Sequence, residues 1–153
     1  MAWPRLKIMP GPHPFISIPE KKTLTMPTEK RLSLEGHEIA YWDEGEGVPL
    51  FFIHGLTASK ESWTPNLAQF TGRYRVIALD LPGFGHSAKP PIDYSIALYG
   101  GVVSAFLANL GIERPHFIGN SMGGHISMLY ALDRPTEVRS LVLVDAAGAN
   151  VDF

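Results

Sequence analysis

The sequence contains no cysteine. This absence excludes disulfide bonds, thiolate metal sites and a thiol nucleophile, and it suits the cytoplasm as the compartment. The longest apolar runs fall far short of the ~20 residues that a membrane-spanning helix needs, so no membrane partner is expected. Lysine and arginine number 13 against 15 aspartates and glutamates, a formal net charge of −2. A protein with so little positive charge is not expected to bind nucleic acid.

Proline is concentrated at the start of the chain. Residues 1–28 hold six of the 13 prolines and show no sustained hydrophobic period, which predicts an extended Pro-rich leader. These prolines also interrupt the apolar run that an export signal requires, so no such signal is predicted. The chain is 45% hydrophobic, and residues 29–153 are long enough to bury a core, so they predict a single domain.

Strand and helix signals alternate after the leader. Residues 31–34 and 37–43 predict an antiparallel hairpin that turns at Glu35 and Gly36. Residues 48–53 (VPLFFI) form a continuous apolar run, typical of a parallel strand covered on both faces. The other predicted elements are strands over 75–79, 116–119 and 140–144, a helical stripe at Trp63, Leu67 and Phe70, and helices over about 94–110 and 122–134.

The sequence also indicates how these helices begin and end. Ser59 or Ser62 is available as the N-cap of the first helix, Gly111 is expected at the C-cap of the second, and Pro135 stops the third. The alternation predicts the α/β class, a mostly parallel sheet of about six strands with an antiparallel N-terminal hairpin. The strand over 140–144 (SLVLV) has the composition of a buried strand, yet no seventh strand is predicted beside it.

The most informative stretch is Gly119-Asn120-Ser121-Met122-Gly123-Gly124, between a predicted strand and a predicted helix. The spacing G-x-S-x-G on such a turn is that of a nucleophile elbow. The turn holds the serine in a strained backbone conformation, and the positions two before and two after it must lack a side chain if strand and helix are to pass closely. Gly119 and Gly123 meet this requirement.

Three motifs together resemble a known family. His54-Gly55, the run from Asp80 to Ser87 (DLPGFGHS) and the run from Gly119 to Gly124 each follow a predicted strand, in the order found in α/β-hydrolase fold enzymes. The similarity extends from about Arg31 to the end of the chain. Since the family sheet has eight strands, the resemblance implies the N-terminal part of this fold, truncated before the last two strands.

The resemblance implies specific roles for three residues. Ser121 would be the nucleophile that attacks an ester or carbonyl substrate, giving an acyl-enzyme or oxyanion intermediate. The backbone N–H groups of Met122 and Leu56 would stabilise the oxyanion. No cofactor and no metal are implied. Asn120 and Met122 beside the serine are similar to C–C bond hydrolases of ring-fission products and also to carboxylesterases, and both substrate classes stay open.

The remaining members of a catalytic triad are harder to find. In the resembling family the chain order is serine, acid, histidine, but the sole histidine after Ser121 is His125. One turn along the helix from the serine, its ring cannot reach over the hydroxyl, so we expect the chain to lack the catalytic histidine. Asp145, at the end of the last strand, is either the acid or an ordinary turn residue. His54 is expected to hold the oxyanion loop in shape.

Two other hypotheses deserve a test against the structure. Gly83 to Ala88 fits the dinucleotide pattern G-x-G-x-x-A, but Pro90 and Pro91 block the helix that a phosphate-binding loop must open. A turn that lines the mouth of a pocket is the better interpretation. The alternative to a complete enzyme is a catalytically incomplete fragment or a non-enzymatic interaction module, which would self-associate through the exposed sheet edge at residues 140–144.

Overall fold

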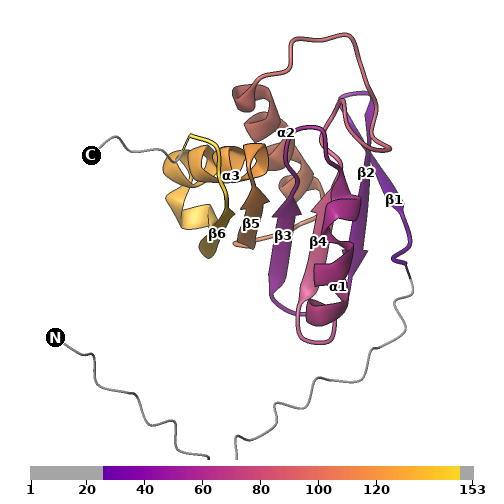
Figure 1. Cartoon of the computed structure of the whole chain (residues 1–153), viewed down its shortest axis with the longest axis vertical. Helices are drawn as coiled ribbons and strands as arrows, with labels where there is room; N and C mark the ends of the chain where they lie inside the picture. The colour runs from indigo at the N-terminus through magenta and orange to yellow at the C-terminus, as the bar shows by residue number, and fades with distance from the viewer. Residues whose placement is uncertain (1–25, 149–153) are drawn as a thin grey trace, which may run out of the picture.

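The structure is a computed structural model that describes residues 26–148, and it contains one six-stranded sheet with helices on both faces (Figure 1). The strand order is β1-β2-β4-β3-β5-β6. The predicted leader lies outside the described residues except for its last three positions. The strands are β1 (Lys30–Leu34), β2 (His37–Glu44), β3 (Pro49–Ile53), β4 (Arg75–Leu79), β5 (His116–Asn120) and β6 (Ser140–Val144).

The hairpin and the parallel strands confirm the predicted α/β class. β1 and β2 pair antiparallel, and Glu35 and Gly36 turn between them with φ values of 49° and 82°, the positive values that a tight hairpin turn requires. β2 also pairs antiparallel with β4, whereas β4, β3, β5 and β6 are mutually parallel. The carboxyl ends of four strands therefore meet at one edge of the sheet.

Alternate side chains of the central strand build two separate cores. Phe51 on β3 faces α2 (Ile96–Asn109) and α3 (Met122–Asp133), where it stacks on Phe106 and meets Phe117 edge to face. Phe52, the next residue, faces α1 (Thr64–Phe70) and packs on Trp63. Both phenylalanines are almost completely buried. This is the two-sided burial that the uninterrupted apolar run over residues 48–53 predicts.

The start of the first helix differs from the prediction. A 3₁₀ turn, η1 (Lys60–Trp63), precedes α1, so Ser62 lies inside a helical turn and donates to the Ser59 carbonyl (2.8 Å). Ser59 occupies the position before η1, but its hydroxyl bonds to the Glu61 carboxylate and caps no backbone N–H. Ser59 is thus the N-cap residue of the first helical turn by position, but neither serine hydroxyl accepts a backbone N–H as a capping side chain would.

The second helix begins and ends close to the predicted positions. The Ser95 hydroxyl accepts from the Leu98 N–H (3.1 Å) as the N-cap of α2. Leu110 is the C-cap, and Gly111 follows it with φ 59°, the left-handed conformation expected just after a helix. The 3₁₀ turn η2 (Pro135–Glu137) follows α3, which ends at Asp133 before Pro135.

The last strand is where the burial prediction fails. β6 pairs only with β5 and forms one edge of the sheet. Leu141 packs against the larger core, but Val142, Leu143 and Val144 are 49%, 41% and 38% exposed. The side of the strand away from β5 has no strand partner within residues 26–148. Among the helices of residues 26–148, none is both long and apolar enough to cross a membrane.

Candidate active site

Four candidate residues gather at the carboxyl edge of the sheet because each one directly follows a parallel strand. His54 follows β3, Asp80 follows β4, Ser121 follows β5 and Asp145 follows β6. In open α/β sheets this edge is where ligands bind. Three of the four positions belong to the motifs singled out in the sequence, and the parallel pairing is what brings them together.

Ser121 has a strained backbone at the turn from β5 into α3. Its φ of 49° and ψ of −113° lie outside the regions that a residue with a side chain normally occupies. The surrounding structure holds it there: its N–H donates to the Val144 carbonyl (3.0 Å), and its own carbonyl accepts from the N–H groups of His125 (3.1 Å) and Ala147 (3.0 Å). Strain of this kind persists only where neighbours fix the backbone, as they do here.

Glycines allow the turn to pack against β3 and the loop after it. A Cβ on Gly123 would lie 2.6 Å from the His54 carbonyl oxygen, and one on Gly119 would lie 2.6 Å from the Gly124 nitrogen. A Cβ on Gly55 would approach the Ser121 Cβ to 3.3 Å. The steric argument drawn from the G-x-S-x-G spacing therefore holds, and it extends to Gly55 on the neighbouring loop.

Leu56 and Met122 line the same pocket, although 66 positions separate them in the sequence. The pocket has a volume of about 370 Å³ and no charged side chain in its lining. Within residues 26–148 no acceptor receives the N–H of either residue. The other lining residues are Gly83, Phe84, Tyr94, Ser95, Ile96 and Tyr99.

Part of the loop with the dinucleotide-like pattern thus lines a pocket mouth, as predicted. Gly83 and Phe84 lie in this lining, and the segment from Gly83 to Ala88 forms turns, with α2 beginning only at Ile96. Gly85 has a φ of 47°, and its Cα lies so close to the Asp80 carboxylate that a Cβ at this position would clash with it. No helix opens at this loop, so it lacks the helix N-terminus on which a dinucleotide-binding loop holds the phosphates.

His54 joins two loops and is completely buried. Its Nδ1 bonds to the Gly55 carbonyl (2.8 Å), and its Nε2 accepts from the Leu81 N–H (3.0 Å). An Nε2 that accepts carries no proton, so the ring is neutral with its proton on Nδ1. Burial lowers the pKa of His54 and outweighs the bond to the Gly55 carbonyl, which acts in the opposite direction. The ring holds the loop after β3, the role expected from the sequence.

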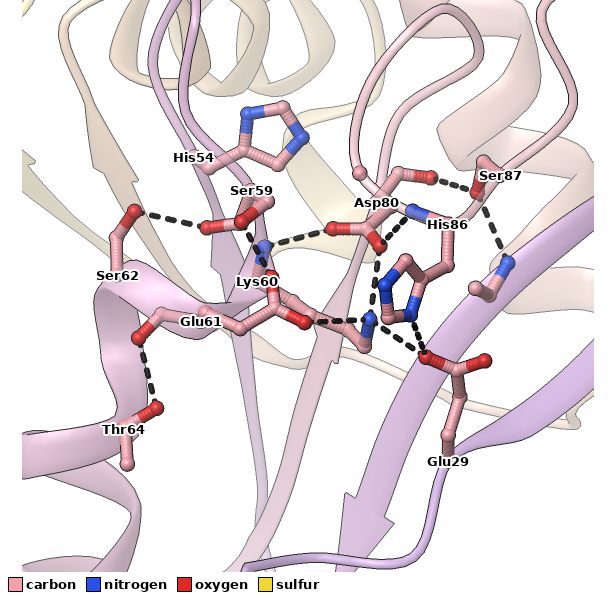
Figure 2. Close-up of polar contacts among 12 residues, drawn as sticks. Glu29, His54, Ser59, Lys60, Glu61, Ser62, Thr64, Asp80, His86 and Ser87 are labelled. Atoms are coloured by element: carbon pink, nitrogen blue, oxygen red, sulfur yellow. Dashed lines mark hydrogen bonds and ion pairs between the residues drawn. The ribbon is translucent and has the colours of Figure 1, made fainter.

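Lys60 forms a buried ion pair that sequence analysis did not find (Figure 2). Its side chain is completely buried, and its Nζ lies 2.8 Å from Asp80 Oδ2, 2.9 Å from Glu29 Oε2 and 3.0 Å from Glu61 Oε1. Burial alone would lower the pKa of Lys60, but hydrogen bonds to these three carboxylates outweigh it and raise the pKa. Lys60 and Glu61 are neighbours in η1, whereas Glu29 and Asp80 come from two other segments, and no short motif links the three.

The comparisons with known proteins agree with this geometry. The sequence profile of the alpha/beta hydrolase fold matches residues 48–152. The chain belongs to the α/β-hydrolase fold family. Similar proteins include Lipase 1 of Psychrobacter immobilis, which is 40% identical over 124 residues, 78% of this chain and 39% of the lipase.

Solved structures of α/β hydrolases superpose on most of the chain. A membrane phospholipase A, described as a bacterial virulence factor, is 43% identical with a TM-score of 0.78, over 80% of this chain and 41% of that one. The meta-cleavage product hydrolase CumD of Pseudomonas fluorescens is 32% identical with a TM-score of 0.75, over 80% and 47%. The chain spans only 31–44% of the length of the curated relatives it matches.

Within residues 26–148 of this α/β-hydrolase fold chain, the Ser121 hydroxyl has no hydrogen-bond partner. No histidine of these residues bonds to it. The His125 ring lies beside Gly148, and His86 bonds to Glu29. His116 bonds to Ser140 (2.6 Å), at the end of β5 away from the serine. The structure thus brings together the serine and the two pocket residues but places no base beside them.

Asp145 lies at the serine's edge of the sheet without contacting it. It follows Val144, whose carbonyl accepts from the Ser121 N–H, and it is exposed with φ 46°. No hydrogen bond or ion pair of its carboxylate is found within residues 26–148. Its backbone conformation is that of a turn residue, and its position leaves both earlier interpretations open.

One group of side chains has the composition of a metal site. Ligand atoms of Glu29, Glu61 and His86 all lie within 4.8 Å of one another. Lys60 Nζ, however, already bonds to both glutamates. The ammonium group occupies the position that a cation would take between these carboxylates, so the cluster is an ion-pair network rather than a metal centre.

Proposed function

We propose that the chain carries the nucleophile of a serine hydrolase, with Ser121 attacking the carbonyl carbon of an ester. The strained backbone at Ser121 is the observation that supports this most strongly, because such a conformation projects a side chain from the sheet edge beside a pocket. Attack forms a tetrahedral intermediate, and its collapse releases the alcohol and leaves an acyl-enzyme. Water then releases the acid and restores the hydroxyl.

The intermediate's oxyanion would be stabilised by the backbone N–H groups of Leu56 and Met122. Both residues line the pocket, and neither N–H has an acceptor within residues 26–148. Met122 is the first residue of α3, so the partial positive charge at the helix N-terminus adds to the attraction. We propose that the base that removes the Ser121 proton lies outside the described residues, since no histidine within them contacts the hydroxyl.

The pocket favours an ester with an apolar acyl group as substrate. Leu56, Phe84, Tyr99 and Met122 offer it apolar surface, and the lining contains no charged side chain. Substrates that carry carboxylates, such as ring-fission products, would need a cation for recognition. Of the two classes left open by the sequence, this lining supports the carboxylesterase. Among the similar proteins, the lipase and the phospholipase A have names that fit this choice, whereas CumD is named for the other class.

Fluorophosphonate labelling tests the nucleophile. The polypeptide that the complete reading frame encodes is treated with an alkyl fluorophosphonate, and the modified peptide is mapped by mass spectrometry. We expect one label, at Ser121, and none in Ser121→Ala. Ser33→Ala, at an exposed position of β1, is the matched control and should label fully. Equal labelling of Ser121→Ala would refute the proposal.

A second candidate rests on the exposed edge strand. We propose that the 153-residue chain self-associates through β6, which exposes Val142, Leu143 and Val144 and whose outer backbone groups have no strand partner within residues 26–148. An exposed apolar edge pairs readily with another strand. Multi-angle light scattering of the 153-residue chain should show dimers or larger species. A monodisperse monomer with a cooperative thermal transition would contradict this.

A further inference from the structure

We propose that Lys60 is a positioning residue, whose buried ion pair with Asp80 fixes the loop of residues 54–59 so that the Leu56 N–H points to the oxyanion. The inference rests on the proposed function for its catalytic consequence. Its structural part, the fixing of the loop, can be tested independently. No role for Lys60 is evident from the motifs in the sequence.

The loop is held at both of its ends by residues that follow β4. At the first end, His54 Nε2 accepts from the Leu81 N–H (3.0 Å). At the second end, Lys60 binds Asp80 twice: its backbone N–H donates to Oδ1 (2.7 Å) and its Nζ to Oδ2 (2.8 Å). Leu56 lies between these two attachments with its side chain 63% exposed. The attachments therefore determine where this otherwise exposed segment lies.

Asp80 is a rigid support because every part of it is bonded. Its N–H donates to the Ala40 carbonyl of β2 (2.8 Å), and its carbonyl accepts from the Ser87 hydroxyl (2.6 Å). The same carboxylate that binds Lys60 also accepts from the His86 N–H (2.8 Å), and Gly85 packs against it. Asp80 is thus fixed to the sheet, and the loop before Lys60 takes its position from it.

The buried ion pair between Lys60 and Asp80 is expected to add little to the stability of the fold, but to restrict the loop to a single conformation. Desolvation of a buried ion pair often cancels its attraction, and apolar residues of the same volume frequently stabilise a protein as well or better. Hydrogen-bonded charges, in contrast, accept few alternative arrangements. Lys60 has three carboxylate partners and lies 5.3 Å from the centroid of the Trp42 ring. Its ammonium group is therefore held from several sides.

The test compares Lys60→Met with the double variant Lys60→Met/Asp80→Asn. Methionine keeps the length of the side chain without its charge. The asparagine keeps the shape of the side chain and one acceptor oxygen, which can serve either the Lys60 N–H or the His86 N–H, and it removes the buried carboxylate that Lys60→Met leaves without its cation. The double variant is included because the single one can fail to fold. Lys30→Met is the matched control, since Lys30 is an exposed lysine that pairs with Asp43 at another part of the sheet.

Two measurements separate positioning from stability. The first is the ¹⁵N order parameter of residues 55–59, expected to fall from a rigid value of about 0.85 to below about 0.6 in the double variant, with no fall in Lys30→Met. The second measurement is the rate of fluorophosphonate labelling of Ser121, in the protein that the complete reading frame encodes. In the double variant the maximal labelling rate should fall at least tenfold. The probe concentration that gives half of the maximal rate should stay unchanged. Removal of a whole oxyanion donor typically lowers the rate by about 10²–10³-fold. We expect a smaller loss here because the Leu56 N–H is displaced and not removed.

The outcomes are distinguishable. A folded double variant with a rigid loop, or with wild-type labelling, overturns the role of Lys60. A wild-type protein that does not label at all refutes the proposed function, whereas the order parameters still decide whether the ion pair fixes the loop. A double variant that labels slowly and also needs a higher probe concentration for half of its maximal rate has lost structure more generally. That result likewise overturns the positioning role.

Discussion

The Leu81 N–H donates to His54 Nε2 across 3.0 Å, so a loop that follows β3 and a loop that follows β4 share one buried imidazole. The bond requires an unprotonated Nε2, and burial lowers the pKa of His54 in agreement with that requirement. A neutral histidine in this place makes the fold sensitive to acid. It also fixes the first residue of the proposed oxyanion loop.

We predict that the free energy of unfolding falls as the pH drops below about 6.5, the ordinary pKa of an unfolded histidine. Below this pH the unfolded chain binds a proton at His54 and the folded chain does not, so stability is lost at up to about 1.4 kcal/mol per pH unit. Above it both states are neutral and no loss occurs. Urea denaturation between pH 7.5 and 5.5 measures the slope.

His54→Asn should be less stable at pH 7.5 and should show a shallower slope. His116, whose pKa burial also lowers, contributes a slope of the same sign in both proteins and so cancels in the comparison. His37→Gln, at an exposed position of β2, is the matched control. If the slope of His54→Asn equals that of the wild type, the neutral buried ring is not the acid-sensitive group.

Glu29 should stabilise the fold over a different pH range. The hydrogen bond from His86 lowers its pKa to about 2, with a further contribution from Lys60 against the opposing effect of burial. The stabilisation is present above the ordinary pKa of 4.5 and is lost as the pH falls towards 2. Because Glu29 is partly exposed, solvent screening limits the expected effect of Glu29→Gln to about 1 kcal/mol.

Thermal unfolding at pH 7, 4 and 2.5 tests this expectation. The difference between wild type and Glu29→Gln should be largest at pH 7 and should narrow at each step. Glu46→Gln, in the exposed loop before β3, should match the wild type throughout. A difference that stays constant with pH would show that Glu29 acts by its packing and not by its charge.

Gly123→Ala should destabilise the protein by at least about 2 kcal/mol. The new Cβ would lie 2.6 Å from the His54 carbonyl oxygen and 2.7 Å from the Ile53 carbonyl carbon, and backbone atoms of a central strand cannot move aside. Gly101→Ala is the opposite case, because a Cβ there meets no atom within 4 Å and α2 gains up to about 1 kcal/mol of helix propensity. Chemical denaturation should show a lower free energy of unfolding for Gly123→Ala and a higher one for Gly101→Ala. An unchanged stability of Gly123→Ala would contradict the close packing at the turn.

Val142→Lys should suppress the proposed self-association. A lysine on an edge strand opposes pairing with a second strand, and Val142 is already 49% exposed, so the folded chain loses little packing. Light scattering at several concentrations should show a larger monomer fraction than in the wild type. Leu132→Lys, at a position of α3 that is 78% exposed, is the control: if it acts as strongly and Val142→Lys does not, the helix face and not the strand edge is the interface.

Short apolar runs between turn residues were the easiest strands to predict. Residues 75–79 and 140–144 were assigned with their observed bounds, because β-branched and aliphatic runs between turn residues leave few alternatives. Burial was predictable only where the covering elements were also in the sequence. Helices cover Phe51 on one face of β3 and Phe52 on the other, whereas Val142 on the edge strand stays 49% exposed.

The site was predictable to the extent that backbone sterics require particular residues. Gly123 and Gly119 had to be glycine for the Ser121 turn to exist, and this requirement is visible in a six-residue window. The Lys60 to Asp80 pair was not predictable, because a lysine at the start of a helix is ordinarily solvated. Only the parallel pairing of β3 and β4, which brings two distant loops together, makes that lysine a buried partner.

The strand order has a consequence for how the chain assembles during synthesis. β2 pairs with β4 and not with β3. The hairpin of β1 and β2 can therefore join the rest of the sheet only after β4 has been synthesised as far as Leu79. β3 in turn lies between β4 and β5, and both of its partners leave the ribosome after it. This apolar strand therefore has no partner until β4 has been made, and its second side stays open until β5 is complete at Asn120. Such a delay leaves nascent β3 open to off-pathway association with other exposed strands.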